Sequence, residues 1–341
     1  MTRASVTIDG TTVAPGTHAT VLLPVPDTFL RQGSAMPVHV FHGRREGPSL
    51  FVCAAIHGDE LNGVEIIRRL LRLKRLGQLA GTLYAIPIVN IYGFTSNTRY
   101  LPDRRDLNRF FPGKEGGSLA SELASVFFEN VVKQCGYGID LHTGSNHRRN
   151  LPHIRGDMED PAVLSMAEAF GAPLALDLSG MEGSLRAAAK ESGVRVLLFE
   201  AGESLRFDEF SIRAGLRGIT SVLESLGMLP AVKRKRRQVP LQIATDRAWC
   251  RAPASGLFRA VAKLGQHVSQ DEVLGTIHDP FAGKSTEMVA PRDGVIIGDQ
   301  SLASVYKGDA VMHIARFDAP RQAQASVDEY SEMVMDARVP R

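Results

Sequence analysis

Residues 50–71 read LFVCAAIHGDELNGVEIIRRLL, and this stretch decides the fold. The uninterrupted apolar run from Leu50 to Ile56 has the length and composition of a buried strand. From Asn62 to Leu76, apolar residues recur at helical spacing and arginines fall on the other side. This pattern predicts an amphipathic helix, with Gly77 as its C-terminal stop. A buried strand followed by a helix is typical of a layered α/β domain.

The same alternation continues to about Gly227. Further strands are expected at 81–90, 137–142 and 194–199, and further helices at 119–134, 160–170 and 208–226. Asp160-Pro161 and Asp208 are residue types that begin helices. We therefore expect a first domain over residues 1–232, in which residues 1–48 form an N-terminal β segment.

Residues 238–317 consist of short strand-like pieces separated by Gly and Pro, which predicts a separate all-β domain. The segment contains a repeat of two motifs: Ala252-Pro253-x-x-Gly256 recurs as Ala290-Pro291-x-x-Gly294, and Gly265-x-x-Val268 recurs as Gly308-x-x-Val311. Two similar halves indicate a two-fold β sandwich, and the segment resembles the biotinyl/lipoyl-like barrel-sandwich hybrid fold. Residues 318–341 are expected to form a polar, loosely held tail.

The composition limits the class of protein. The chain has 341 residues, 44% hydrophobic and 23% charged, which excludes a disordered chain and a polytopic membrane protein. Its net charge of +3 includes the run Lys233–Arg237, without which the balance is negative, and so concentrated a charge argues against a nucleic-acid partner. The 3 cysteines are far apart, and neither a secretory signal nor a membrane span is evident. We expect a cytoplasmic protein.

Ionisable side chains follow two of the predicted strands. His57 and Glu60 come directly after the first strand, and His142 ends the strand that begins at Tyr137. Ligands and catalytic groups in open α/β sheets collect at such strand ends, so these side chains can converge on one point. Two histidines and one glutamate form the ligand set of catalytic zinc, which leaves a fourth position for water.

A third strand end and one loop add further candidates. Glu200 follows a strongly apolar strand, where a poorly solvated carboxylate is suited to accept a proton. The loop around residues 99–113 contains groups that could bind carboxylates, or that form only a solvated basic loop: Arg99, Arg104, Arg105, Asn108 and Arg109. Residues 147–155 leave a similar choice between an anion-binding pocket wall and a solvated loop.

Together these motifs resemble the succinylglutamate desuccinylase/aspartoacylase family, relatives of the zinc carboxypeptidases. The likeness runs from about Ser49 to Leu226 and rests on four segments in this order: His57-Gly58-Asp59-Glu60, Asp106-Leu107-Asn108-Arg109, Asp140-Leu141-His142-Thr143-Gly144 and Phe199-Glu200-Ala201-Gly202. The resemblance implies a zinc-carboxypeptidase-like mixed sheet flanked by helices, followed by the C-terminal all-β barrel-sandwich domain.

The resemblance also implies roles for individual residues. Zinc, one ion per chain, would be bound by His57, Glu60 and His142, and Glu200 would be the general base and later the acid. Arg99 would stabilise the oxyanion, although Arg104 or Arg105 could take that place because the gap to Asn108 is long. A substrate carboxylate would be held by Asn108, Arg109 and, by a looser match, Arg186. Asp106 would orient His57.

The expected function is a zinc-dependent amide hydrolase that removes an acyl group from a small N-acyl amino acid or related carboxylate. A metallocarboxypeptidase that acts on a small acidic or modified peptide is the alternative within enzymes. A biotin or lipoate carrier is the alternative from another class, but Lys284 lacks the flanking residues of either modification site. The all-β domain is expected to shape access to the site, and a homo-oligomer is possible.

Overall fold

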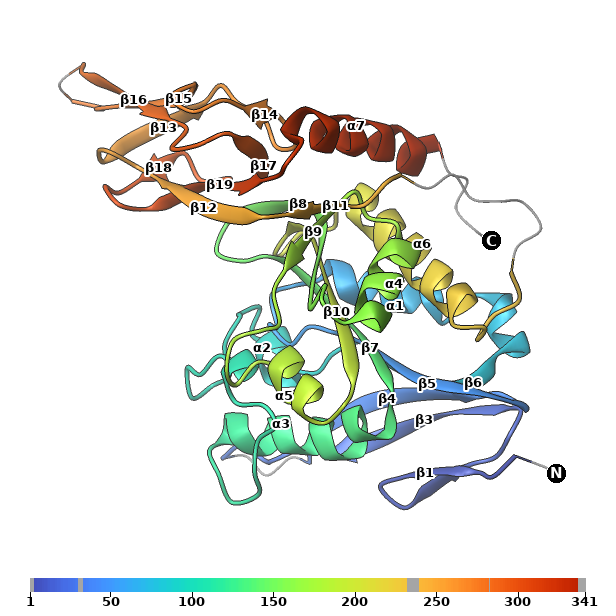
Figure 1. Cartoon of the computed structure of the whole chain (residues 1–341). Coiled ribbons are helices and arrows are strands. Elements are labelled where there is room, and N and C mark those ends of the chain that lie inside the picture. The colour runs from blue at the N-terminus through green and yellow to red at the C-terminus, as the bar shows by residue number, and fades with distance from the viewer. Residues whose placement is uncertain (1–2, 30–32, 232–238, 282, 337–341) are drawn as a thin grey trace.

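The computed structural model describes residues 3–29, 33–231, 239–281 and 283–336. Within these residues a mixed sheet of 13 strands runs through the molecule (Figure 1). Its centre consists of the parallel strands β6 (Ala80–Ile86), β5 (Arg45–Ala54), β7 (Tyr137–Gly144) and β10 (Arg195–Glu203). Antiparallel strands continue it on both sides, with β4 (Ala35–His42) and β3 (Thr17–Pro24) beyond β6, and β8 (Arg148–Gly156) beside β10. A hairpin of β1 (Val6–Ile8) and β2 (Thr11–Val13) forms a small sheet of its own.

Helices cover both faces of this sheet, because the central strands are apolar on both sides. In β5, Leu50 and Val52 belong to one hydrophobic core, and Phe51 and Cys53 belong to the other. The first core is closed by α1 (Asn62–Leu70), α4 (Pro161–Phe170) and α6 (Glu209–Ser225). The second is closed by α2 (Ile91–Thr95), α3 (Leu119–Asn130) and α5 (Leu185–Glu191). The expected α/β sheet flanked by helices is thus confirmed, whereas the finer likeness to zinc carboxypeptidases stays a prediction.

Three expected elements stop at least four residues early. The first helix ends at Leu70 rather than Leu76, because Leu73 is extended and a short 3₁₀ helix occupies Lys74–Gln78. Leu73 and Leu76 are still buried in the core, but the 3₁₀ turn places them there rather than a longer α-helix. The strand expected at 81–90 stops at Ile86, since Asn90 caps α2 by accepting from the Gly93 N–H. Likewise, the helix expected to reach residue 134 stops at Asn130 and is followed by a 3₁₀ turn at Val132–Gln134.

The C-terminal β segment is more closely joined to the rest than expected. Its strands β12 (Asp246–Arg251), β19 (Ala310–Arg316) and β17 (Gly294–Gln300) extend the large sheet, since β17 pairs with β8 and β14 (His267–Val268) pairs with β17. A separate four-stranded sheet contains β13 (Gly256–Ala260), β15 (Val273–His278), β16 (Ser285–Val289) and β18 (Ser304–Val305). Both sheets enclose one core, to which Val268 and Val311 of the sequence repeat contribute. The expected domain boundaries stay a prediction.

Two short strands add to the large sheet beside β8, and the second of them belongs to the segment that leads into the C-terminal β strands. β9 (Leu174–Asp177) runs parallel to the second half of β8, and β11 (Gln242–Ala244) runs parallel to β9. The basic run at 233–237 lies outside the described residues.

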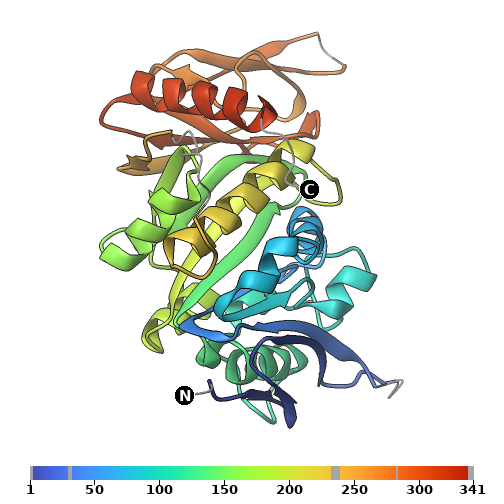
Figure 2. The same ribbon diagram turned by 90° about the vertical axis from the view of Figure 1, so that its right-hand side faces the viewer.

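The expected loose tail is wrong for residues 320–336, which form helix α7 (Pro320–Asp336). Figure 2 shows α7 lying across the C-terminal strands. Its buried residues Val327, Tyr330 and Met333 pack on the cores of both parts of the chain. The helix therefore packs the C-terminal strands against the N-terminal part of the chain.

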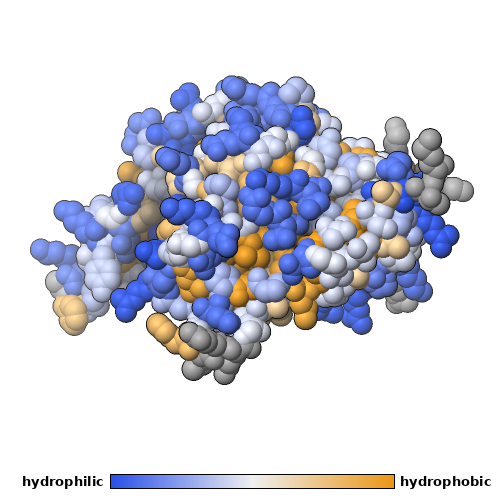
Figure 3. All heavy atoms as spheres, turned by 90° about the horizontal axis from the view of Figure 1, so that it is seen from below, coloured by the Kyte–Doolittle hydropathy of each residue, from blue (hydrophilic) through white to orange (hydrophobic). Residues whose placement is uncertain are grey.

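The face seen in Figure 3 is largely hydrophilic, with a band of hydrophobic residues across its middle. Among the described residues, no helix combines the length and apolar character that crossing a membrane requires. The possible homo-oligomer stays a prediction.

Candidate metal centre and active site

The site begins at the turn that follows β5. Ala55 has a positive φ of 51°, and the chain then turns so that His57 and Glu60 both lie beyond the strand end. Gly58 is required in this turn, because a Cβ there would lie only 1.9 Å from the backbone carbon of Gly93. The sequence around His57 therefore holds two ligand-type side chains at one rigid edge of the sheet.

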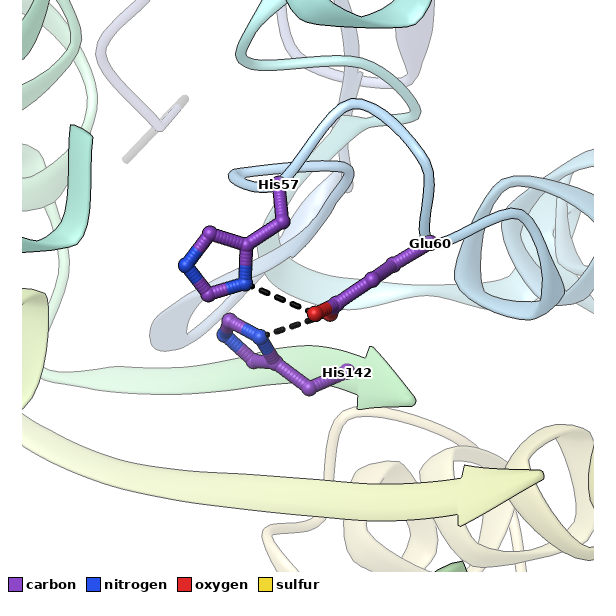
Figure 4. A group of neighbouring side chains, drawn as sticks. All are labelled: His57, Glu60 and His142. Atoms are coloured by element: carbon purple, nitrogen blue, oxygen red, sulfur yellow. Dashed lines mark hydrogen bonds and ion pairs between the residues drawn. The ribbon is translucent and has the colours of Figure 1, made fainter. Parts of the chain in front are cut away.

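Three buried side chains converge at this edge, as Figure 4 shows. His57 and Glu60 come from the turn, and His142 comes from β7, the strand next to β5. His57 Nδ1 lies 2.8 Å from Glu60 Oε1, and His142 Nδ1 lies 2.8 Å from Glu60 Oε2. One ligand atom from each residue lies within 4.8 Å of the others. The three residues expected to bind metal are therefore brought together.

An outer carboxylate holds each histidine. Asp106 Oδ1 lies 3.1 Å from His57 Nε2, and Asp140 Oδ2 lies 2.8 Å from His142 Nε2. Each Nε2 therefore faces an outer carboxylate, and each Nδ1 faces Glu60. Asp140 was not expected in this role, although its position two residues before His142 on the same strand places both side chains on one face. Such carboxylate–histidine pairs are typical of metal ligands.

The electrostatics of the cluster suit a cation. Burial alone would lower the pKa of His57 and His142, but Glu60 and the outer carboxylates outweigh it and raise the pKa of both. Burial alone would raise the pKa of Glu60, but the two histidines hold it well below its ordinary value. The donor set thus stabilises positive charge between its ligand atoms, and two imidazoles with one carboxylate are the ligands that zinc prefers.

Arg99 lies beside this cluster. Its guanidinium donates to Asp106 Oδ2 at 2.8 Å and to Ser145 Oγ at 2.5 Å, and it lies 3.5 Å from Glu60 Oε1. Arg104 is exposed, and Arg105 pairs with Asp103 away from the pocket. Of the three arginines considered for the oxyanion, Arg99 alone lines the pocket.

Glu200 faces the same pocket from β10. It pairs in register with His142 of β7, and β8 lies on its other side. Asn150 Nδ2 donates to Glu200 Oε2 at 2.7 Å, and Arg155 Nη1 lies 3.2 Å from Oε1. Each carboxylate oxygen therefore has a partner from β8.

The expected carboxylate-binding residues differ in their surroundings. Asn108 already accepts a hydrogen bond from the Leu185 N–H through Oδ1, and Arg109 is a half-exposed residue that donates to the Asn108 carbonyl. Arg186 is different, because its Nε and Nη1 are buried without a hydrogen-bond partner. Burial lowers the pKa of Arg186 to about 10, and the neighbouring Arg155 adds to the effect. A buried unpaired guanidinium indicates a place for an anion.

These groups line one cavity of about 570 Å³. Sequence reasoning missed several lining residues, namely Ser145 and, on β12, Arg247 and Trp249. Of residues 147–155, Arg148, Asn150 and Arg155 line the pocket, so the structure favours a pocket wall over a solvated loop for these three. Arg247 and Trp249 gave no local signal, because only the long-range pairing of β17 with β8 and of β12 with β19 brings their strand to the pocket.

The wall from the C-terminal strands is built by stacking. Trp249 stacks on His313 with ring centroids 4.4 Å apart, and the Arg148 guanidinium lies 5.1 Å from the Trp249 ring centre. Burial lowers the pKa of His313 to about 3, aided by nearby arginines, so this ring is neutral. The C-terminal part of the chain therefore contributes a rigid aromatic surface to the pocket.

Comparison with known proteins identifies relatives of the chain. The model of the succinylglutamate desuccinylase/aspartoacylase catalytic domain matches residues 46–226. The chain is 28% identical over 311 residues to N-alpha-acetyl-L-2,4-diaminobutyric acid deacetylase from Halomonas elongata, covering 87% of this chain and 91% of that protein.

Solved structures share the fold over most of the chain. The succinylglutamate desuccinylase/aspartoacylase from Rhodobacter sphaeroides superposes with a TM-score of 0.79 at 26% identity, covering 88% of this chain and 96% of that one. The product-bound ectoine utilization protein EutE from Ruegeria pomeroyi has the same fold, with a TM-score of 0.78 at 24% identity over 88% of this chain and 95% of its own. The chain therefore belongs to the succinylglutamate desuccinylase/aspartoacylase family.

Proposed function

We propose that the chain is a zinc-dependent amide hydrolase that removes an acyl group from a small N-acyl amino acid or related carboxylate. The observation that carries the proposal is the shared pocket of the buried cluster His57, Glu60 and His142, the carboxylate of Glu200, and the unpaired guanidinium of Arg186. The deacetylase from Halomonas elongata, named for an N-acetylated amino acid, supports the same class of substrate.

The metal would be held by His57 Nδ1, the Glu60 carboxylate and His142 Nδ1. Bound there, zinc would polarise the amide carbonyl and make water at the site more acidic. Asp106 and Asp140 keep the two Nδ1 atoms directed at this position by accepting from the Nε2–H groups.

Proton transfer is assigned to Glu200. Its carboxylate takes a proton as water attacks the carbonyl carbon, and it delivers that proton to the nitrogen when the carbon–nitrogen bond breaks. The products are a carboxylate from the acyl group and a free amine. Arg99, which lies beside Glu60, is placed to stabilise the negative charge that develops on the carbonyl oxygen.

Substrate binding is assigned to Arg186, Arg109 and Asn108. Arg186 has the strongest claim on a substrate carboxylate, because its buried donors are otherwise unpaired. The cavity volume of about 570 Å³ suits a small molecule, and Arg247 and Trp249 of β12 close one side of it. The C-terminal strands would thereby limit access for larger substrates.

Amine release from a panel of N-acetyl, N-succinyl and N-formyl amino acids by the zinc-loaded protein tests the proposal. Dipeptides with a free C-terminus belong in the same panel, because they are substrates for the alternative, a metallocarboxypeptidase. We expect turnover of at least one N-acyl amino acid with a clear preference over the dipeptides. Turnover of dipeptides alone would favour the carboxypeptidase, and turnover of neither class would refute amide hydrolysis of small N-acyl carboxylates.

A further inference from the structure

A chain of hydrogen bonds behind Glu200 is not used by the roles assigned so far. It runs from the Leu151 carbonyl through His153 to Arg155 and ends on Glu200. Leu151, His153 and Arg155 all belong to β8, and His153 lies directly opposite Glu200 in the antiparallel pair of β8 with β10.

The protonation of His153 follows from its two partners. His153 Nδ1 lies 2.7 Å from the Leu151 carbonyl oxygen, so Nδ1 must carry a hydrogen. Arg155 Nε donates to His153 Nε2 at 3.2 Å, and because a guanidinium cannot accept, Nε2 must be unprotonated. Complete burial, with Arg155 nearby, also lowers the pKa of His153 well below its ordinary value. His153 is therefore a fixed neutral acceptor.

Arg155 thus donates to His153 through Nε and contacts Glu200 through Nη1. With its Nε fixed by His153, its Nη1 lies 3.2 Å from Glu200 Oε1. Asn150 holds Oε2 from the same strand at 2.7 Å. Asn150 is supported in turn by a C-terminal strand of the large sheet, since it pairs in register with Gly298 of β17. The plane of the Glu200 carboxylate is fixed at both oxygens.

We propose that Arg155, held by His153, is a positioning residue that fixes the Glu200 carboxylate for proton transfer. The inference rests on the proposed function, because it deepens the role of Glu200 in amide hydrolysis. Arg155 acts through Glu200, whereas Arg186 in the same pocket has unpaired donors and is left to bind substrate. The two arginines should therefore differ in which kinetic constant they control.

The first test compares Arg155→Met with the matched control Arg186→Met, using the best substrate from the N-acyl amino acid panel. Arg155→Met is expected to lower kcat at least about tenfold while KM changes less than about threefold, because positioned acid–base groups contribute in the chemical step. Arg186→Met should mainly raise KM. A rise in KM without a fall in kcat for Arg155→Met would make Arg155 a substrate-binding residue and overturn the proposal.

The second test separates positioning from mere stability. His153→Leu should lower kcat about threefold or more alone, but by less than about twofold when Arg155→Met is already present, since residues in one network are not additive. His153→Gln, which keeps an acceptor for Arg155, should recover part of the loss. In Arg155→Ala, added guanidinium ion should restore part of kcat. Equal effects of His153→Leu in both backgrounds, together with no rescue, would overturn the proposal.

A third test needs no turnover. In crystal structures of Arg155→Met and His153→Leu, the Glu200 carboxylate should be rotated from its wild-type position. If the panel contains no substrate, the proposed function fails while this structural arm still decides the positioning role. A Glu200 carboxylate that keeps its place in both variants would refute the inference.

Discussion

The two walls of the pocket differ in how their charges are paired. In the cluster at the ends of β5 and β7 the charges are paired, since Glu60 lies between two histidines and each histidine has an outer carboxylate. The second wall contains Arg186 and Arg247: Arg186 has buried donors without partners, and no described carboxylate forms an ion pair with either arginine. The cluster in the first wall is arranged to bind a cation. The buried donors in the second wall lack an anionic partner, which a bound ligand would supply.

This difference predicts that substitutions on the two walls affect different properties of the enzyme. Changes near the paired wall should reduce the rate of the chemical step. Changes on the unpaired wall should weaken substrate binding, and they should leave the protein at least as stable, because an uncompensated buried charge is removed.

The largest effect is expected for Glu200→Gln. The variant should retain zinc and bind substrate but lose at least about a hundredfold in kcat, the usual scale for a positioned acid or base. Single-turnover rates, zinc content and substrate binding measured on one preparation check this. Near-normal turnover would move the role to another carboxylate, of which Glu203 is the nearest in sequence.

A smaller effect is expected for Arg186→Met, which keeps the bulk of the side chain and removes its charge. KM should rise about tenfold or more, as expected when a charge-assisted contact to substrate is lost. The midpoint of thermal unfolding should be unchanged or higher. Arg109→Met is the control, since Arg109 is half-exposed and should change KM less. A lower unfolding midpoint with unchanged KM would show that Arg186 has a structural role instead.

The smallest effects are expected for the pocket residues of strand β12. Arg247→Gln and Trp249→Leu should change kcat/KM a few-fold, and by different factors for substrates with different acyl groups, because these residues line the pocket but have no part in the proposed chemical step. Zinc content should not change. Equal factors for all substrates would show that β12 has no part in selectivity.

Much of the paired wall could be predicted from the sequence. His57 and Glu60 follow the apolar strand β5, His142 and Glu200 lie near the C-terminal ends of β7 and β10, and such ends of neighbouring parallel strands meet at one edge of a sheet. A local pattern is enough for such a site, because each residue is placed by its own strand. Asp140 was missed as a partner although its spacing from His142 on the strand carries the same information.

The unpaired wall could not be predicted in this way. Arg247 and Trp249 reach the pocket only because β17 pairs with β8 and β19 joins β12 to β17, and no local pattern encodes the partner of a strand. The helix α7 was missed for a different reason. Its buried Val327, Tyr330 and Val334 have helical spacing, but many polar residues between them hide the stripe.

The central claim is that the buried cluster of His57, Glu60 and His142 is a zinc site that amide hydrolysis requires. The most direct measurement titrates the chelator-treated protein with zinc while amine release and bound metal are followed together. We predict that release is absent at the start, rises in proportion to added zinc, and stops rising at about one ion per chain, the stoichiometry of a three-ligand catalytic site. The His57→Ala, His142→Ala double variant should remain inactive and metal-free at every point. Full activity in the chelated protein, or stoichiometric zinc in the double variant, would contradict the claim.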